Sequence, residues 1–391
     1  MNIKYKIIIP LGLVALLAAG CNNKNNASPS AQSTNQPPTT TIPTTTQNQQ
    51  NTVPSIPVSF LPTATSSAQS ISTIPSNGDT NPYGVAFVPT GFPSGGKLNP
   101  GDVLVSNWNN NKNLQGGGTT IVRITPTGKQ SLFFQGKKPL GLTTALAVLK
   151  SGFVIVGNLP TTDGTIATAK AGSLLILDSK GKLITTLTDK NLINGPWDMA
   201  VNDNGAQVQA FVSNVLSGSV VRFNLTFSSS GLTSNKGTMI ASGFAHHGDP
   251  NAAVVGPTGL FYNVKSDSLL VASTADNAIY SIANAGKASI SQILGTVVYK
   301  DDQHLRGPLG IALAPNGNLL VANGDAINPD KTQPSEIVEF TPAGTFVKEL
   351  SLDANQGGAF GLAIDVSANT IRLAAVNDNT PSLLIWTIPL Q

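Results

Sequence analysis

Histidine and aspartate side chains are the groups in this chain whose types best suit metal binding or acid–base chemistry. They gather in two connections, GFAHHGDP at 243–250 and DDQHLRG at 301–307, and the candidate ligands are His246, His247, Asp249 and His304. Imidazole binds transition metals and titrates near neutral pH. If the two connections meet, they would suit a divalent metal and a metal-assisted lyase or hydrolase. The alternative is solvated loop residues, because adjacent side chains of an extended segment point in opposite directions.

Composition excludes several other chemistries. The 391 residues include one Cys, which excludes a disulfide framework and any Cys-rich metal site. The 23 Lys and Arg against 20 Asp and Glu provide no basic excess for binding nucleic acid. The three Glu all lie between Glu336 and Glu349, so a mechanism using paired Glu would depend on one short stretch. The patterns GxSxG, HExxH and GxxxxGK[ST] are absent from the sequence.

A repeat supplies the elements that must position such groups. A Pro-x-Gly step, or a related one, opens an apolar strand six times, at Pro82, Pro139, Pro196, Pro257, Pro308 and Ala359. A second strand follows in each unit, and in five units it ends in Asn: Asn107, Asn158, Asn214, Asn323 and Asn377. Asn at a strand end either bonds the backbone to start a turn or, in a ring of such units, faces a polar ligand.

Four strands fit into each repeat of about 50 residues, which is typical of a blade of a β-propeller. The sequence therefore predicts an all-β fold of six blades over residues 68–391. The sixth unit has only three strands, because the sequence ends at Gln391. We expect the segment 68–74 to supply the missing outer strand, since this pairing closes the ring and covers an exposed sheet edge.

The segments PLGIALAPNGNLLVAN at 308–323 and IVEFTPAG at 337–344 resemble the NHL repeat of six-bladed propellers. The resemblance extends over roughly residues 80–388 and implies the fold rather than the function, because related propellers include binding scaffolds, lactonases and lyases. In the gluconolactonase-like relatives, Glu, Asn and Asp near the mouth of the central channel bind a divalent metal.

The residue between Pro and Gly is expected at the mouth of the channel. The six residues there are Tyr83, Leu140, Trp197, Thr258, Leu309 and Phe360. None is a carboxylate or an amide, and Asp198 is the one acid nearby, which argues against a lactonase of that type. Tyr83, Trp197 and Phe360 could instead stack on a small organic ligand. The alternative is that these rings fill the channel as core.

The N-terminal residues read as a targeting signal and a tether. Residues 1–20 have a basic start, an apolar run and small residues before Cys21, and LLAAGC resembles the lipobox of bacterial lipoproteins. The resemblance implies acylation of Cys21, with palmitate as the expected acyl group. Of residues 22–55, 29 of 34 are Ser, Thr, Asn, Gln or Pro, so we expect a disordered tether over 21–67.

These features favour a lipid-anchored β-propeller of the bacterial cell envelope that acts as a binding or scaffold module. Its partner is expected to be a protein or a glycan, bound through the channel face that carries the long loops. We expect a monomer that binds no nucleic acid and needs no cofactor unless the histidine site holds a metal. By resemblance to lipoprotein sorting in Gram-negative bacteria, Asn22 rather than Asp after the acylated Cys implies the outer membrane. A metal-assisted enzyme and a structural protein without a ligand are the alternatives.

Overall fold

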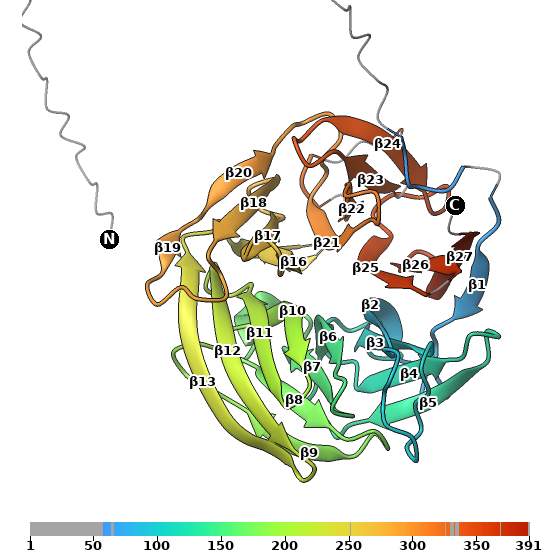
Figure 1. Ribbon diagram of the computed structural model, residues 1–391, viewed down its shortest axis with the longest axis vertical. Coiled ribbons are helices and arrows are strands. Elements are labelled where there is room, and N and C mark those ends of the chain that lie inside the picture. The colour runs from blue at the N-terminus through green and yellow to red at the C-terminus, as the bar shows by residue number, and fades with distance from the viewer. Residues whose placement is uncertain are drawn as a thin grey trace, which may run out of the picture. The chain divides into compact units, whose positions relative to one another are not determined.

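The computed structural model describes residues 58–63, 66–250, 252–324, 326–328, 332, 336–367 and 369–389. Within these ranges the strands form six sheets of four or five strands around a common axis (Figure 1). The helical structure there is a single 3-10 turn, η1 (Ile166–Thr168). The protein is therefore an all-β propeller of six blades, as the repeat predicts.

The predicted signal segment, Cys21 and the tether up to residue 57 lie outside the described residues. In the part of the chain that is described, no helix has the length and apolar character needed to cross a membrane.

The first three strands of each blade are consecutive and antiparallel, and the first of them lies closest to the axis. Blades one and two are β2 (Thr80–Phe87), β3 (Val103–Asn109), β4 (Thr120–Ile124) and β5 (Gln130–Gln135), then β6 (Leu142–Val148), β7 (Val154–Asn158), β8 (Ser173–Leu177) and β9 (Leu183–Leu187). Blade three is β10 (Pro196–Asn204), β11 (Gln207–Asn214), β12 (Ser219–Ser228) and β13 (Gly231–Ser242), with β19 (Gln292–Ile293) added in parallel.

The second half of the ring repeats this arrangement. Blade four is β16 (Pro257–Asn263), β17 (Ser268–Ser273), β18 (Ala278–Ala283) and β20 (Thr296–Tyr299), and blade five is β21 (Pro308–Leu313), β22 (Leu319–Asn323), β23 (Glu336–Phe340) and β24 (Phe346–Ser351). Blade six is β25 (Ala359–Val366), β26 (Thr370–Asn377), β27 (Ser382–Pro389) and β1 (Gln69–Ser72). A short hairpin of β14 (His247–Asp249) and β15 (Ala253–Val255) joins blades three and four.

Blade six combines strands from both ends of the propeller. β1 pairs antiparallel with β27, with Ile71 opposite Leu383. Ile71 is buried and packs with Val105 and Val122 of blade one. This pairing covers the edge of β27 and adds an apolar contact between the sixth and first blades.

The glycine of the repeated Pro-x-Gly step has a packing role. A Cβ atom on Gly259 would overlap the carbonyl oxygen of Leu309 in the next blade, and one on Gly361 would overlap that of Tyr83. The inner strands therefore approach each other backbone to backbone around the axis, which only glycine permits. Farther out, apolar side chains form the layers between blades, as where Ile155 of β7 packs with Val212 of β11.

Residues 58–63, which we call the strap, belong to no sheet but are bound to blade five. The backbone N–H groups of Phe60 and Leu61 donate to the Glu339 carboxylate at 2.8–3.0 Å, and the Ser59 hydroxyl donates to it at 2.7 Å. Leu61 is 4% exposed and belongs to the core between blades five and six. The chain predicted as a free tether over 21–67 is thus held in place from residue 58, because its apolar residues reach a buried site.

Candidate functional site

Three aromatic residues of the inner strands meet at one end of the channel. The ring centroids of Tyr83 (β2) and Phe360 (β25) lie 4.5 Å apart in a stacked pair, and Trp197 (β10) contacts Tyr83 edge to face at 5.5 Å. Trp108 from β3 joins them, 4.9 Å from Trp197. These four rings, which we call the aromatic plug, close the channel. The sequence-based reasoning found three of them and missed Trp108, which follows the repeated Asn107 by one residue.

The aromatic plug is mostly core. Tyr83 is 3% exposed, Trp197 is 2% exposed and Trp108 is 1% exposed, whereas Phe360 is only partly buried. The hydroxyl of Tyr83 is also buried, and this burial, together with the nearby Asp378, raises its pKa in spite of a hydrogen bond with Asn81. The rings therefore stabilise the channel by packing, and Phe360 offers the most ring surface to a ligand.

A cavity of about 400 Å³ lies directly over the aromatic plug, and we call it the mouth cavity. Its floor includes Tyr83, Trp197 and Phe360. Its polar walls come from strand ends and loops of blades one and six and are formed chiefly by Asn81, Asn109, Asn113, Gln356, Asp378 and Asn379. Among the described residues that line it there is no Lys, Arg or His. The cavity thus combines an aromatic floor with amide and carboxylate walls.

The carboxyl group of Asp378 is the one acidic side chain among the described lining residues. Burial raises its pKa from the ordinary value near 4 to about 6. A partly buried carboxylate without a cation beside it is well suited to accept hydrogen bonds from a neutral donor. At neutral pH it would also repel an anionic ligand.

Two amides in the walls have polar atoms without a protein partner. Asn81 is 5% exposed and Asn109 is 2% exposed, and the Oδ1 atoms of both lack a hydrogen bond. Asn81 also has a φ of 57°, a backbone conformation that is uncommon outside glycine. Sequence-based reasoning missed both residues. The Asn-rich loop NWNNNKN at 107–113 and its unusual length were the available signals.

The repeated Asn residues do not line the mouth cavity. Asn158 Oδ1 accepts a hydrogen bond from the Gly141 N–H at 2.9 Å, and Asn214 Oδ1 accepts one from the Asn194 N–H at 2.9 Å. All five are buried, at 0–6% exposure: Asn107, Asn158, Asn214, Asn323 and Asn377. The expectation that their amides face a ligand is corrected accordingly. Most of them tie the connection before the inner strand to the second strand of the same blade, which is the turn-stabilising alternative.

The histidines are not brought together as a metal site. His246 and His247 are exposed, and His246 Nδ1 lies 3.0 Å from the Phe244 carbonyl oxygen. His304 Nδ1 lies 2.7 Å from Asp301 Oδ2, and its ring stacks on Phe346 at 3.8 Å. In the described part of the chain, no three His, Cys, Asp or Glu side chains are grouped so that they could hold a metal ion. The predicted group of His246, His247, Asp249 and His304 is therefore not assembled there, because each connection is folded on its own neighbours.

The glutamates serve the fold of blade five. Glu336 is fully buried and pairs with Arg306, whose Nη1 also lies 3.5 Å from Glu349 Oε1. Glu339 holds the strap. None of them is among the residues lining the mouth cavity.

Asp198 lies deeper in the channel, beside the aromatic plug. Its carboxylate accepts hydrogen bonds from the N–H groups of Met199 at 2.8 Å and Leu260 at 2.9 Å. Burial raises its pKa to about 7, although these hydrogen bonds oppose the shift. The space beside it has a volume of only about 60 Å³, so it is too small for an organic ligand.

No family model matches this chain, and no curated protein sequence matches it. Solved structures with a similar fold include a putative gluconolactonase, with 15% identity, 84% of this chain and 95% of that chain covered, and a TM-score of 0.43. A streptogramin B lyase has 12% identity, covers 83% and 98%, and has a TM-score of 0.43. A calcium-binding protein, regucalcin from Agrobacterium tumefaciens strain C58, has 11% identity, covers 81% and 93%, and has a TM-score of 0.48. At these identities the likeness concerns the propeller fold alone.

Proposed function

We propose that the protein binds a neutral carbohydrate in the mouth cavity and acts as a non-enzymatic recognition module. The observation that carries this proposal is the combination of an aromatic floor with amide and carboxylate walls and no cationic side chain among the described lining residues. Sugars have an apolar face of C–H groups and a rim of hydroxyl groups, and this cavity is complementary to both.

The walls favour a ligand with many hydroxyl groups. Asp378 and the oxygens of Asn81 and Asn109 accept hydrogen bonds, so they require donors on the ligand. A phosphate or a uronic acid has acceptors and negative charge where the cavity offers a carboxylate, so it would bind poorly. Neutral hexoses and their oligomers meet the requirement.

The floor and the size are consistent with one or two sugar units. Phe360 is the ring with the most surface facing the cavity, and Tyr83 stacks behind it. An aromatic face in contact with the C–H face of a sugar buries apolar area on both sides. A volume of about 400 Å³ lies at the lower end of the range for small-molecule sites.

We also propose that Cys21 is acylated and anchors the chain to a membrane of the bacterial envelope. The support is the sequence before Cys21, in which a basic start, an apolar run and small residues precede the one Cys of the chain. Cys21→Ser should move the protein from the membrane fraction to the soluble fraction, and retention in the membrane fraction would contradict the proposal.

Isothermal titration calorimetry against neutral and acidic oligosaccharides tests the proposed ligand class. Phe360→Ala should weaken the binding of a neutral glycan by about 10-fold or more, because the sugar loses its stacking surface. Asp378→Asn should weaken it less and should reduce the discrimination against acidic sugars. Val366→Ala is the matched control, since Val366 lies at the other end of the same strand β25 and is 56% exposed. Failure of every neutral glycan to bind at millimolar concentration, or equal affinities of wild type and Phe360→Ala, would overturn the proposal.

A further inference from the structure

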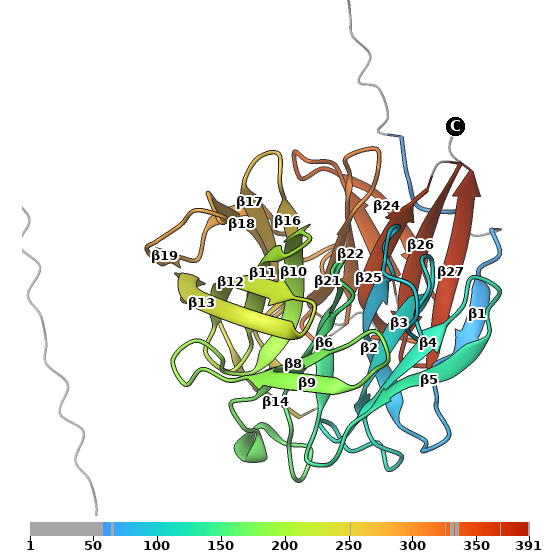
Figure 2. The same ribbon diagram turned by 60° about the horizontal axis from the view of Figure 1, so that its bottom comes forward.

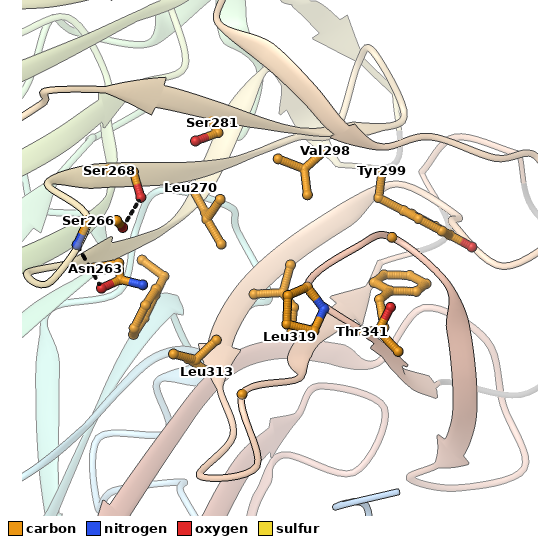
Figure 3. A pocket seen from close by; sticks show the side chains of 15 residues that line it. Asn263, Ser266, Ser268, Leu270, Ser281, Val298, Tyr299, Leu313, Leu319 and Thr341 are labelled. Carbon is orange, nitrogen blue, oxygen red and sulfur yellow. Dashed lines mark hydrogen bonds between the residues drawn. The ribbon is translucent and has the colours of Figure 1, made fainter. Parts of the chain in front are cut away.

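A second cavity lies between blades four and five, near the end of the ring away from the mouth cavity. Its volume is about 490 Å³, and we call it the open groove. Leu270 and Val298 of blade four face Leu319 of blade five across it (Figure 3). Ser281 lies at one side in the same view. Phe340 is a further, aromatic residue of the lining. The groove is therefore mainly apolar, with hydroxyl groups along one side.

The strand register shows that the open groove has an equivalent between blades five and six. Leu270 pairs with Ser281 across β17 and β18, as Leu320 pairs with Glu339 across β22 and β23. Leu270 lies three residues before the end of β17, and Leu320 lies three residues before the end of β22. Their partners are therefore equivalent, and Ser281 occupies the position in blade four that Glu339 occupies in blade five. The opposite walls of the two grooves are also equivalent. The paired residues Leu319 and Phe340 form this wall in blade five, and the paired residues Leu373 and Trp386 take the same positions in blade six.

The equivalent groove is already filled by the chain itself. Leu61 of the strap packs there with Leu373 and Trp386. Glu339 accepts the backbone N–H groups of the strap, and Lys348 Nζ donates to the Leu61 carbonyl oxygen at 2.9 Å. This groove therefore binds an extended peptide through one buried apolar side chain and hydrogen bonds to the backbone.

One side-chain position explains why the groove between blades four and five is open. The residue equivalent to Glu339 is large in every blade but the fourth, where it is serine; in chain order the residues are Arg123, Ile176, Arg222, Ser281, Glu339 and Ile385. In blade three, the buried Arg222 reaches across and donates to the Ala285 carbonyl oxygen at 2.8 Å. Serine is too short to fill the same volume.

We propose that the open groove binds an extended segment of a partner protein, with a Leu, Ile or Phe side chain in the place that Leu61 takes in the equivalent groove. Ser281 and Ser268, at the positions of Glu339 and Asn318, offer hydroxyl groups to the peptide backbone.

The occupied groove identifies the chemistry of this partner. It is an uncharged, extended segment with small or hydroxyl-bearing residues before the apolar side chain, like Ser59 before Phe60 and Leu61. Because Ser281 lacks the charge of Glu339, binding there should be weaker than that of the strap and reversible. The proposal is independent of the ligand in the mouth cavity.

Fluorescence anisotropy with a labelled synthetic peptide of the strap sequence, IPVSFLPT, tests the proposal on the full chain. The wild type should bind the peptide saturably. Ser281→Ile, the residue found in blades two and six, should fill the groove and weaken binding by at least 10-fold. Ser281→Glu, which recreates the carboxylate of blade five, should strengthen it several-fold. Val366→Ala is the control for the fold and should bind as the wild type does, and melting temperatures verify that the variants are folded.

Three outcomes would overturn the proposal. The first is the absence of saturable binding at millimolar peptide. The second is unchanged affinity in Ser281→Ile, which would place the peptide elsewhere, for example in exchange with the strap. The third is a concentration-dependent dimer of the wild type that Ser281→Ile abolishes, because the groove would then belong to a second copy of this chain.

Discussion

The two ends of the propeller ring are built in different ways. At the mouth, side chains from loops of unequal length create a polar cavity over the aromatic plug. At the other end, the repeat places equivalent grooves between blades, and the residue at the position of Ser281 and Glu339 decides what fills each groove. A large side chain fills the groove from its own blade, Glu339 binds the strap, and Ser281 leaves the groove open. In Figure 2, the hairpin strand β14 lies at the lower end of the ring, which is the end that carries the mouth cavity. New binding surfaces thus arise in one region from loops and in the other from one residue of a repeated strand.

The largest predicted effect is a loss of thermal stability when the N-terminal segment that contains the strap and β1 is deleted. A chain beginning at residue 76 lacks both β1 and the strap, so the edge of β27 and the apolar groove under Leu61 become exposed. We expect the melting temperature to fall by on the order of 10 °C or more. A chain beginning at residue 58 is the control and should melt like the full chain. Equal melting temperatures for the two truncations would show that the strap side contributes nothing to the ring.

Replacing Glu339 should separate the occupied groove from the open one. In Glu339→Ala, the N–H groups of Phe60 and Leu61 lose their acceptor, so the free energy of unfolding should fall by about 3 kcal/mol. Ser281→Ala at the equivalent position should change it by less than about 0.5 kcal/mol. Urea unfolding measures both values, and hydrogen exchange at residues 60 and 61 should accelerate only in the first variant. Similar values for the two variants would contradict the equivalence of the grooves.

Asn residues at the mouth end should divide into structural and ligand-binding sets. Asn214→Ala removes the acceptor of the Asn194 N–H and a donor to the Leu192 carbonyl, so it should cost about 1–3 kcal/mol of stability without changing glycan affinity. Asn113→Ala, at an exposed wall of the mouth cavity, removes the acceptor of the Asn109 amide (2.7 Å), so it should weaken glycan binding more than it lowers stability. Calorimetry and urea unfolding on the same two proteins check this. A loss of affinity in Asn214→Ala that exceeds its loss of folded protein would restore the ligand role of the repeated Asn set.

The smallest predicted effect is the contribution of Asp378 to the dependence of stability on pH. Burial raises the folded-state pKa of Asp378 to about 6 and that of Asp198 to about 7, so the folded chain binds these protons more tightly than the unfolded chain. Their contribution is fully present below about pH 4 and is lost as the pH rises through 6 and 7. Stability at pH 5 should therefore exceed that at pH 8, by on the order of 1 kcal/mol from Asp378. Asp378→Asn should make the fall in stability between pH 4 and 6 about half as steep, because Asp198 still contributes over that range.

Acid should reverse this trend below about pH 4. Burial alone would raise the pKa of Glu339, but its hydrogen bonds with Asn318 and the strap lower it. Burial also opposes the shift of Asp301, whose bonds with Tyr299 and His304 lower its pKa to about 2. The stability that these carboxylates contribute is present above their unfolded pKa values and is lost as the pH falls through the folded ones. Thermal melts from pH 2 to 9 should show a maximum near pH 4, and a monotonic profile would contradict these assignments.

The sequence by itself determined the number of blades, the strands within them and the aromatic character of the channel mouth. These features depend on neighbours that are close in the chain: hairpin strands pair locally, and a period of about 50 residues with a Pro-x-Gly step repeats the same unit. Tyr83, Trp197 and Phe360 were found because each occupies the same place in its unit. The three-dimensional role of that glycine, the close approach of Gly259 to Leu309, is consistent with the motif but not visible in it.

Only the tertiary structure decided which polar groups face a ligand and which hold the fold. The repeated Asn residues have the right chemistry for a site, yet their amides are used by the backbone of their own blades, while Asn81 and Asn109 from outside the repeat line the cavity. The contact of Leu61 with blade six and the vacancy beside Ser281 join residues that are far apart in the chain. Such contacts depend on volumes and distances between blades, and these are defined only when the ring is closed.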